Sequence, residues 1–408
     1  MKKKILFVDD ESMVLDGLRR MLRSMRTEWD MEFVASGEAA LRLLAEKPFD
    51  VIVSDMRMPA MNGAELLAEV MKRHPTTIRL ILSGYADKDL ILKCVGSTHQ
   101  YLSKPCDAES LKSAITRASD LDSSLQSSKL RSLVCRMSRL PSIPTLYTQV
   151  VEKVSEADAS LEEVGNLIGK DISMTVQVLK LSNSAFFGLR RQLSTAQEAV
   201  AYLGMDTIKA LVLSIHAFSQ FDKAETGSLR IDTLWNHSLA VASFARRIAK
   251  LESQEAKMAD ESFTAGVLHD LGKLILAVNA PNDYVEANRL ANMGVELTIA
   301  EEKVFGANHA DVGGYLIGLW GLPTPVVEAV ALHHNPSKAT HHAFSPLTSV
   351  HAANILELEH SKPNSNAAAP QLDNNYLSLV GCGGRVAGWR NLVTENAKSY
   401  ESANTVCR

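Results

Sequence analysis

Short apolar runs alternate with amphipathic stretches over the first 120 residues of the chain. Three runs have the continuous apolar pattern of buried strands, at residues 5–8, 51–54 and 80–82. Three stretches have apolar positions at helical spacing, at residues 13–26, 39–46 and 64–72. Strands and helices that alternate at this pitch predict βαβ units, and therefore an α/β doubly wound domain whose parallel sheet is covered by helices on both faces.

The pattern beyond residue 144 is almost entirely helical, and runs typical of strands are nearly absent. Apolar residues recur on one face of six segments, at residues 146–155, 160–170, 174–183, 196–203, 207–218 and 234–251. We therefore expect the second half of the chain to be an all-α domain or a pair of helical subdomains.

The boundary between the two patterns lies at residues 121–139, where Ser, Lys and Arg become frequent. A narrow apolar stripe at helical spacing enters this segment. It covers too few heptads for a coiled coil, so we expect a plain helix followed by a polar linker. Pro141 and Pro144 then prevent a helix from continuing. We expect a first domain at 1–120, a linker at 121–139, and a helical domain at 140–400 with parts at about 140–225 and 226–400.

The composition narrows the class of protein. Hydrophobic residues make up 46% and charged residues 22% of the 408 residues, which indicates a globular chain of several domains. The 43 basic residues do not exceed the 47 acidic ones, which argues against nucleic-acid binding. The five cysteines form no C-x-x-C pair, and no apolar stretch reaches the ~18 residues of a membrane span. We expect a cytoplasmic protein that does not enter the membrane.

Several chemically active side chains follow the predicted strands. Asp9 and Asp10 follow the first strand, Asp55 the third, Ser83 the fourth and Lys104 the last. In a doubly wound sheet the carboxyl ends of the strands meet at one edge, so we expect these side chains to lie together. Clustered carboxylates repel one another, and a Mg²⁺ ion with oxygen ligands relieves that repulsion. The lysine and the serine can contact a phosphoryl group at the same edge.

Four motifs in these 120 residues resemble the response-regulator receiver family, in the order and spacing of that family: Phe7–Glu11, Ser54–Pro59, Ser83–Tyr85 and Tyr101–Pro105. The resemblance implies a flavodoxin-like, five-stranded parallel sheet. It also implies that Asp55 accepts a phosphoryl group from a sensor histidine kinase. The other implied roles are Mg²⁺ binding by Asp9, Asp10 and Asp55, phosphoryl sensing by Ser83 and Lys104, and a conformational switch at Tyr101.

Ten of the twelve histidines lie beyond residue 200. Imidazole and carboxylate groups are good ligands for divalent transition metals. The candidate metal ligands are His237, His269, Asp270, His309, His333 and His334. They lie far apart along the chain, so they can meet only if several helices converge. A single buried histidine is more often a core residue than a ligand. The prediction of a metal site therefore depends on the whole set of residues.

This pattern resembles the HD superfamily of metal-dependent phosphohydrolases, and residues from about 136 to 400 resemble its HDOD branch. Further landmarks are Leu140–Pro144, Leu181–Ala185, Ala199–Gly204 and Gly318–Pro323. The resemblance implies Fe, Mn or Zn at the candidate ligands, with Lys273 as a candidate phosphate contact. A receiver followed by an HDOD domain implies a bacterial two-component response regulator.

Two departures weigh against hydrolysis. Relatives that hydrolyse cyclic di-GMP have a Gly-Tyr-Pro motif shortly after the double histidine, and none follows His333-His334 here. The superfamily's late metal-binding aspartate is replaced by Asn354, a neutral and weaker ligand. We therefore favour an HDOD output that binds an unidentified downstream protein. The alternative is a phosphorylation-gated, metal-dependent phosphohydrolase acting on a nucleotide or cyclic dinucleotide. The sequence leaves a homodimer open.

Overall fold

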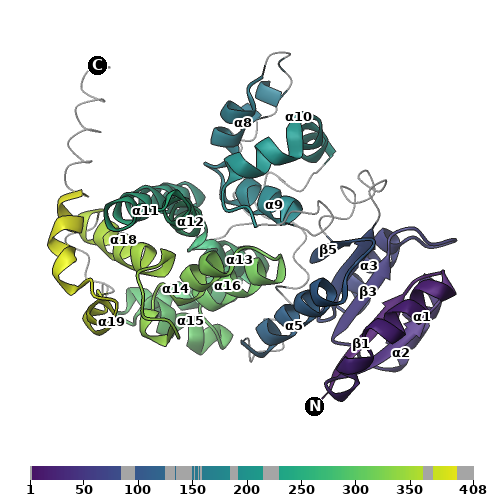
Figure 1. Cartoon of the computed structure of the whole chain (residues 1–408). Helices are drawn as coiled ribbons and strands as arrows, with labels where there is room; N and C mark the ends of the chain where they lie inside the picture. Colours follow the sequence, from purple (N-terminus) through teal and green to yellow (C-terminus); the bar gives the residue numbers. More distant parts are fainter. Residues whose placement is uncertain are drawn as a thin grey trace.

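The structure is a computed structural model of the chain (Figure 1). The described residues are 2–83, 97–124, 159–183, 192–214, 229–361 and 371–392, together with a few positions between 134 and 156. The predicted linker beyond residue 124, apart from Val134, and half of the predicted helix at 146–155 lie outside them. Within the described ranges, no helix is both long enough and apolar enough to cross a membrane.

The N-terminal region is a five-stranded sheet in which all neighbouring strands are parallel. Its strands, in the spatial order β2-β1-β3-β4-β5, are β1 (Lys3–Val8), β2 (Trp29–Val34), β3 (Val51–Asp55), β4 (Ile78–Ser83) and β5 (Gln100–Ser103). Every residue of β3 and β4 is buried, because helices cover both faces of the sheet. The prediction of a doubly wound parallel sheet is confirmed. The strand order reverses between β1 and β3, which is where such folds bind ligands.

The described helices of this region are α1 (Ser12–Met21), α2 (Gly37–Glu46), α3 (Gly63–Arg73) and α5 (Ala108–Ser124). The Ser36 hydroxyl accepts from a backbone amide at the start of α2, and Asn62 begins α3 with a capping box. The helix predicted at 13–26 is too long: α1 ends at Met21, and a 3-10 helix (Arg23–Thr27) follows. Leu22 and Met25 are both buried, and a spacing of three residues fits either kind of helix.

The described C-terminal region is helical, as predicted. Its first group of helices is α8 (Leu161–Ile168), α9 (Ile172–Ser182) and α10 (Ala196–Ser214). The second group is α11 (Ile231–Glu252), α12 (Ala256–Leu268), α13 (Leu271–Asn279), α14 (Pro281–Asn292), α15 (Leu297–Phe305), α16 (His309–Leu319), α17 (Thr324–Leu332), α18 (Pro346–Ser361) and α19 (Asn374–Leu379). The break predicted within α10 falls at Gly204, whose φ of 78° interrupts the helix.

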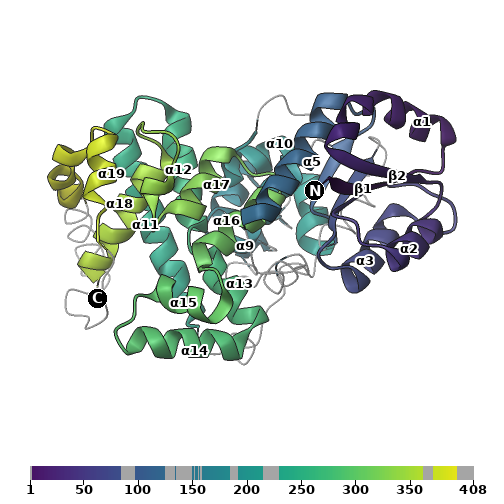
Figure 2. The same ribbon diagram turned by 90° about the horizontal axis from the view of Figure 1, so that it is seen from below.

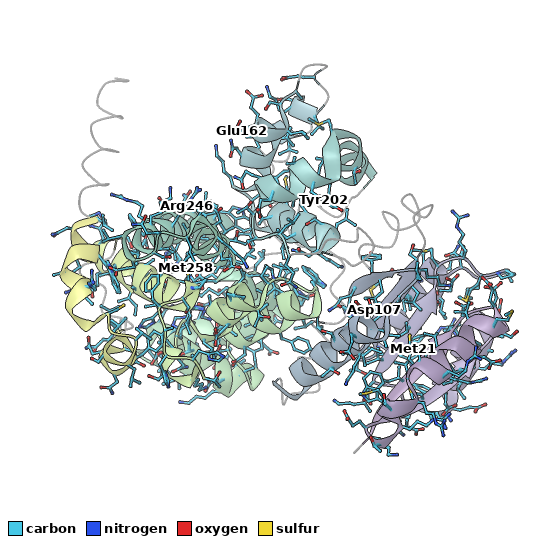
Figure 3. All side chains as sticks on the ribbon, viewed as in Figure 1. Met21, Asp107, Glu162, Tyr202, Arg246 and Met258 are labelled. Carbon is cyan, nitrogen blue, oxygen red and sulfur yellow. The ribbon has the colours of Figure 1, made fainter. Side chains whose placement is uncertain are left out.

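Helices of the second group pack together in a bundle with a largely apolar core, which also encloses several buried polar side chains. α11 packs against α12 and α18, α13 packs against α16, and α17 packs against α12, α16 and α18. Side chains fill the space between these elements (Figure 3). Seen from below, α5 of the N-terminal region lies between the sheet and α16 (Figure 2), and these two helices are in contact. The bundle therefore meets the N-terminal region directly.

Candidate functional site

The predicted acidic residues meet at the carboxyl edge of the sheet. We call Asp9, Asp10, Asp55, Ser83 and Lys104 the acidic centre. The Lys104 ammonium lies 2.7 Å from Asp9 Oδ2 and also contacts Asp55 Oδ1. Asp9 and Asp55 are 1% and 6% exposed, whereas Asp10 is exposed at the same strand end. The sheet topology therefore brings two buried carboxylates onto one lysine.

Backbone amides hold both carboxylates in place. The Glu11 amide donates to Asp9 Oδ1 at 2.9 Å, and the Arg57 amide donates to Asp55 Oδ2 at 2.6 Å. Each carboxylate thus uses one oxygen for the backbone and turns the other toward Lys104. The Ser83 carbonyl accepts from the Lys104 amide at 2.8 Å, so β4 carries the segment with the lysine. Ser83 and Tyr101, the predicted sensor and switch residues, are both fully buried.

The charges of the acidic centre are not balanced. Burial raises the pKa of Asp55 above its usual range, although Lys104 acts in the opposite direction. Burial lowers the pKa of Lys104, but hydrogen bonds to Asp55 and Asp9 outweigh this effect and raise the pKa overall. One ammonium therefore faces two buried carboxylates, and exposed Asp10 adds a third acidic group. This excess of negative oxygen ligands fits a hard divalent cation such as Mg²⁺.

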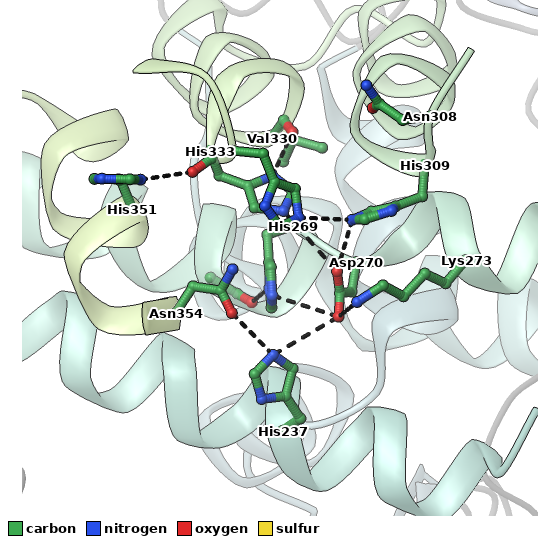
Figure 4. A network of polar contacts seen from close by, with 12 residues as sticks. His237, His269, Asp270, Lys273, Asn308, His309, Val330, His333, His351 and Asn354 are labelled. Atoms are coloured by element: carbon green, nitrogen blue, oxygen red, sulfur yellow. Dashed lines mark hydrogen bonds and ion pairs between the residues drawn. The ribbon is translucent and has the colours of Figure 1, made fainter. Parts of the chain in front are cut away.

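The six candidate ligands of the second half also converge. We call His237, His269, Asp270, His309, His333 and His334 the histidine centre. His237 lies on α11, His269 and Asp270 lie between α12 and α13, and His309 begins α16. The double histidine His333-His334 directly follows α17. Figure 4 shows the labelled side chains of this centre pointing toward one another.

Asp270 occupies the middle of the histidine centre and is 1% exposed. Four imidazoles present Nε2 to it. His309 and His333 lie 3.3 and 4.0 Å from Oδ1, whereas His269 and His237 lie 3.5 and 3.7 Å from Oδ2. The Lys273 ammonium also contacts Oδ2, at 2.7 Å. Residues from five segments thus surround one carboxylate.

The Nδ1 atom of each of these four imidazoles is bonded away from Asp270. His269 and His333 donate to the carbonyls of Gly266 and Val330, at 2.8 and 2.9 Å. His309 and His237 each bond a carboxylate oxygen at 2.6 Å, from Glu301 and Glu357 respectively. An Nδ1–H bonded to an oxygen acceptor leaves the lone pair on Nε2, which is the usual arrangement of metal-binding histidines.

Three buried atoms aimed into the histidine centre have no hydrogen-bond partner among the described residues: His269 Nε2, His333 Nε2 and Asp270 Oδ1. Such an atom costs about 1–3 kcal/mol when nothing bonds it. The ligand atoms form two groups, each within 4.8 Å: one of His237, His269 and Asp270, and one of His309, His333 and His334. The Nε2 atoms of His309 and His334 lie 3.0 Å apart, close to the spacing of two nitrogens that share one ion at about 2.1 Å.

The protonation states suit metal ligands. Burial lowers the pKa of His269 to about 4, and burial also lowers the pKa of His333 and His334 well below the usual range. Burial raises the pKa of Asp270, but its imidazole neighbours and Lys273 outweigh this and lower it overall. At neutral pH the centre therefore offers free lone pairs on three imidazoles beside an ionised carboxylate, the forms that bind a metal ion.

Residues that contact the histidine centre include Asn354, which the sequence indicated as a weak ligand, and three residues that the sequence analysis did not name: Glu301, Glu357 and His351. Glu301 is fully buried, and its Oε2 accepts from both the amide and the ring of His309. Glu357 lies one helical turn beyond Asn354 on α18, and helical spacing could have indicated it. The Asn354 amide oxygen lies 3.1 Å from His237 Nε2, beside the first ligand group. His351 donates from Nδ1 to the His333 carbonyl at 2.7 Å and so supports the backbone of a ligand.

Comparisons with known proteins identify two domains in the chain. The family model described as "Response regulator receiver domain" matches residues 5–116, and the model described as "HDOD domain" matches residues 140–336. Receiver domains generally bind Mg²⁺, and HD-type domains bind divalent metals.

Individual relatives match parts of the chain. An uncharacterized protein of Treponema pallidum is 27% identical over 226 residues, covering 55% of this chain and 43% of its own. The hydrogenase transcriptional regulatory protein HoxA of Cupriavidus necator is 37% identical over 116 residues, covering 28% of this chain and 23% of its own. The chain thus spans less than half of either relative.

Among solved structures, the MmoQ response regulator of Methylococcus capsulatus is 23% identical, with a TM-score of 0.49, and the match covers 62% of this chain and 98% of that one. The two family matches together span both described regions of the chain. The chain therefore joins a response regulator receiver domain to an HDOD domain, which is the domain composition of a two-component response regulator.

Proposed function

We propose that Asp55 accepts a phosphoryl group from a sensor histidine kinase and that the added charge controls the HDOD domain. The observation that supports this most strongly is the shared lysine: Lys104 contacts Asp9 Oδ2 and Asp55 Oδ1 at the edge where the strand order reverses. Asp55 is held by one backbone amide and is desolvated, so its other oxygen, which contacts Lys104, is a positioned nucleophile.

The reaction at Asp55 is a transfer between two nucleophiles. A carboxylate oxygen of Asp55 bonds to phosphorus, the bond from phosphorus to the imidazole nitrogen of the donor breaks, and that nitrogen keeps the electron pair. The product places a phosphate of about −1.5 to −2 charges beside Lys104. Mg²⁺, held by Asp9, Asp10 and Asp55, supplies charge neutralisation at the phosphoryl oxygens when it is bound. Ser83 lies at the end of β4, next to this edge, as a sensor requires.

Labelling by a small phosphodonor tests the acceptor. Full-length protein is incubated with acetyl phosphate and Mg²⁺, and the phosphoryl group is measured by intact mass. We expect labelling in the wild type and in Asp16→Asn, an aspartate of α1 that pairs with Arg19 on the surface. We expect none in Asp55→Asn, and none in the wild type with excess EDTA. Equal labelling of Asp55→Asn would overturn the assignment.

A second candidate function, divalent metal binding at the histidine centre, rests on the three buried atoms without partners. The imidazole Nε2 atoms and Asp270 would hold one or two cations, which would give the three unpartnered atoms a partner that the described residues do not supply. Fe and Zn suit a donor set rich in imidazole, and Mn suits the carboxylate of Asp270. With metal bound, the site also has the chemistry for phosphoester hydrolysis, with Lys273 as a phosphate contact, and a nucleotide or cyclic dinucleotide is the alternative substrate.

Elemental analysis and a hydrolysis screen separate these possibilities. Protein purified without chelator is measured for Fe, Mn and Zn, in the wild type and in Asp270→Ala. We expect metal in the wild type and a large loss in the variant. Turnover of a nucleotide or cyclic dinucleotide that Asp270→Ala abolishes would favour the hydrolase. Metal without turnover would favour a structural centre in an output domain that binds protein, and wild-type protein without metal would overturn metal binding.

The partners proposed for the whole chain follow from its two domains. The receiver domain implies a sensor histidine kinase as the source of the phosphoryl group. The HDOD domain is proposed to contact a downstream protein, in the cytoplasm where such kinases present their phosphorylated histidine. A homodimer is an open alternative, and light scattering of the phosphorylated and unphosphorylated forms would decide it.

A further inference from the structure

The motif Gly318–Pro323, which neither proposed function uses, forms the end of α16. The Leu322 amide donates to the Ile317 carbonyl, and the Gly321 amide donates to the Gly318 carbonyl. These two bonds are those of a Schellman motif, which needs a residue with positive φ at its turn. Gly321 supplies it, with a φ of 76°. The motif leaves the carbonyls of Leu319 and Gly321 available to groups outside the helix.

Three parts of the chain meet at this turn, residues 319–321. Gln100, on β5 of the receiver, donates from Nε2 to the Leu319 carbonyl at 2.9 Å. Gln192, which follows the α8–α9 helices, donates from Nε2 to the Gly321 carbonyl at 3.1 Å. Between them the Lys180 ammonium of α9 lies 4.7 Å from the centre of the Trp320 ring, and Trp320 is 3% exposed. The turn is therefore a junction between the receiver and both parts of the HDOD domain.

The other end of α16 is His309 of the histidine centre. Between the two ends, α16 packs too closely to slide past its neighbours. A Cβ at Gly272 of α13 would lie 1.8 Å from the His309 carbonyl oxygen, and a Cβ at Gly314 would lie 2.6 Å from Ala331 of α17. α13 follows Asp270 and α17 precedes His333, so both neighbours carry ligands. A shift of α16 is therefore passed on to the two segments that carry Asp270 and His333.

We propose that the 319–321 turn, rather than the packing of α5 against α16, is the contact through which the receiver and the histidine centre act on one another. The receiver side of the contact is Gln100, which directly precedes Tyr101 on the strand that leads to Lys104. A change at Lys104 when Asp55 is phosphorylated reaches β5, then the Leu319 carbonyl, then α16 and its ligand His309. This inference rests on the proposed function, because it needs a phosphoryl group at one end and a metal ion at the other.

Coupling of this kind is reciprocal: if a phosphoryl group changes the affinity for metal by some factor, metal changes the affinity for the phosphoryl group by the same factor. A single hydrogen bond from a neutral amide limits the size of the effect. We expect phosphorylation to change the affinity for metal by a factor of about three to ten, the low end of the range usual for coupled sites.

The test titrates Zn²⁺ into full-length protein by calorimetry, with and without beryllofluoride as a phosphoryl mimic. Saturating Mg²⁺ is present throughout, because it occupies the oxygen ligands of the acidic centre while Zn²⁺ prefers imidazole. The decisive variant is Gln100→Met, which keeps the length of the side chain and removes its amide donor. The matched control is Gln197→Met, whose amide bonds Asn166 on a surface away from the turn.

We expect beryllofluoride to change the Zn²⁺ affinity about three- to tenfold in the wild type and in Gln197→Met. In Gln100→Met both Zn²⁺ and beryllofluoride should still bind, and the ratio of the Zn²⁺ affinities with and without beryllofluoride should fall to about one. Two results would overturn this inference alone, provided that both ligands bind. One is a Zn²⁺ affinity of the wild type that beryllofluoride does not change, and the other is an equal change in Gln100→Met and the wild type. Failure of the wild type to bind one of the ligands would overturn the corresponding part of the proposed function, and the coupling with it.

Discussion

The acidic centre and the histidine centre each contain a lysine that contacts an aspartate. They differ in how many of their buried polar atoms lack a hydrogen-bond partner. Lys104 lies 2.7 Å from Asp9, and Lys273 lies 2.7 Å from Asp270. In the acidic centre, backbone amides and Lys104 bond the oxygens of Asp9 and Asp55. In the histidine centre, three atoms remain without a partner among the described residues although a lysine is present.

This difference indicates how each centre works. Lys104 is 27% exposed, so the acidic centre is open to a phosphodonor and can exchange its contacts as charge arrives. The ligands His269, His309 and His333 are fully buried and only His237 and His334 are partly exposed, so most of the histidine centre is enclosed and its geometry is fixed by packing. We infer that the first centre is built for a transient covalent change and the second for a ligand that stays. The four predictions below test this contrast.

Metal removal should have the largest effect. A metal ion at about 100 to 1,000 times its Kd adds about 3–4 kcal/mol to the free energy of unfolding. We expect a chelator to lower the melting temperature of the wild type and of Asp260→Ala, whose carboxylate pairs with Arg246 at the surface. Asp270→Ala should show no such shift. An identical shift in Asp270→Ala would place the stabilising ion outside the histidine centre.

Replacing Lys104 should have the second-largest effect. Lys104→Met leaves two buried carboxylates without their shared ammonium, and we expect the free energy of unfolding to fall by about 2 kcal/mol in Mg²⁺-free buffer. Mg²⁺ should restore most of it, because the cation takes the place of the ammonium. Lys72→Met, which breaks an exposed pair with Glu69, should leave the free energy of unfolding almost unchanged. The measurement is thermal unfolding with and without Mg²⁺, and a loss that Mg²⁺ leaves unchanged would contradict the contrast.

Acid should destabilise the metal-free histidine centre. Burial lowers the pKa of His269 from 6.5 to about 4, so the folded protein keeps this imidazole neutral while the unfolded chain takes up a proton. The free energy of unfolding should therefore fall as the pH drops below 6.5, by on the order of 2 kcal/mol for this residue between pH 7 and 5. His333 and His334 act in the same direction, and His309, whose pKa is raised through Glu301 despite burial, acts in the opposite one.

Urea unfolding in EDTA across this pH range measures the effect. A free energy of unfolding that stays constant from pH 7 to pH 5 would show that the buried imidazoles are not held neutral in the fold.

The smallest effect concerns a residue that only orients a ligand. Glu301→Gln removes the charge that bonds His309 Nδ1 and keeps the size of the side chain. We expect Zn²⁺ affinity to fall about tenfold, which corresponds to about 1.4 kcal/mol. Glu302→Gln changes the exposed neighbour on the same helix and should leave the affinity unchanged. Calorimetric titration measures both, and equal affinities would show that Glu301 does not orient the ligand.

The acidic centre could be predicted from the sequence because the topology alone brings its residues together. Parallel strands end at a common edge, so Asp9, Asp55 and Lys104 needed only to follow apolar runs to be placed. The strand β2 (Trp29–Val34) was harder to see. It lies at the edge of the sheet, and its apolar residues alternate with polar ones, whereas the central strands are continuous apolar runs.

The histidine centre could be predicted only in part. Its ligands occur in recognisable combinations such as His269-Asp270, but Glu301 and Glu357 look like ordinary helical glutamates in the sequence. Glu301 precedes Glu302, and nothing local distinguishes the fully buried residue from the exposed one. What separates them is the position of α15 against the start of α16, which depends on packing between elements rather than on a motif.

The ring hydrogen bonds of His269 and His333 to backbone carbonyls also stabilise the ends of α12 and α17. Each histidine is the C-terminal cap of its helix, α12 or α17, and its ring N–H bonds the carbonyl three residues earlier, in the last turn. Carbonyls in a last turn have no partner within the helix. One ring therefore closes a helix with one nitrogen and offers a lone pair with the other. Replacing either histidine by alanine would fray a helix as well as remove a ligand, so such a variant measures two losses at once.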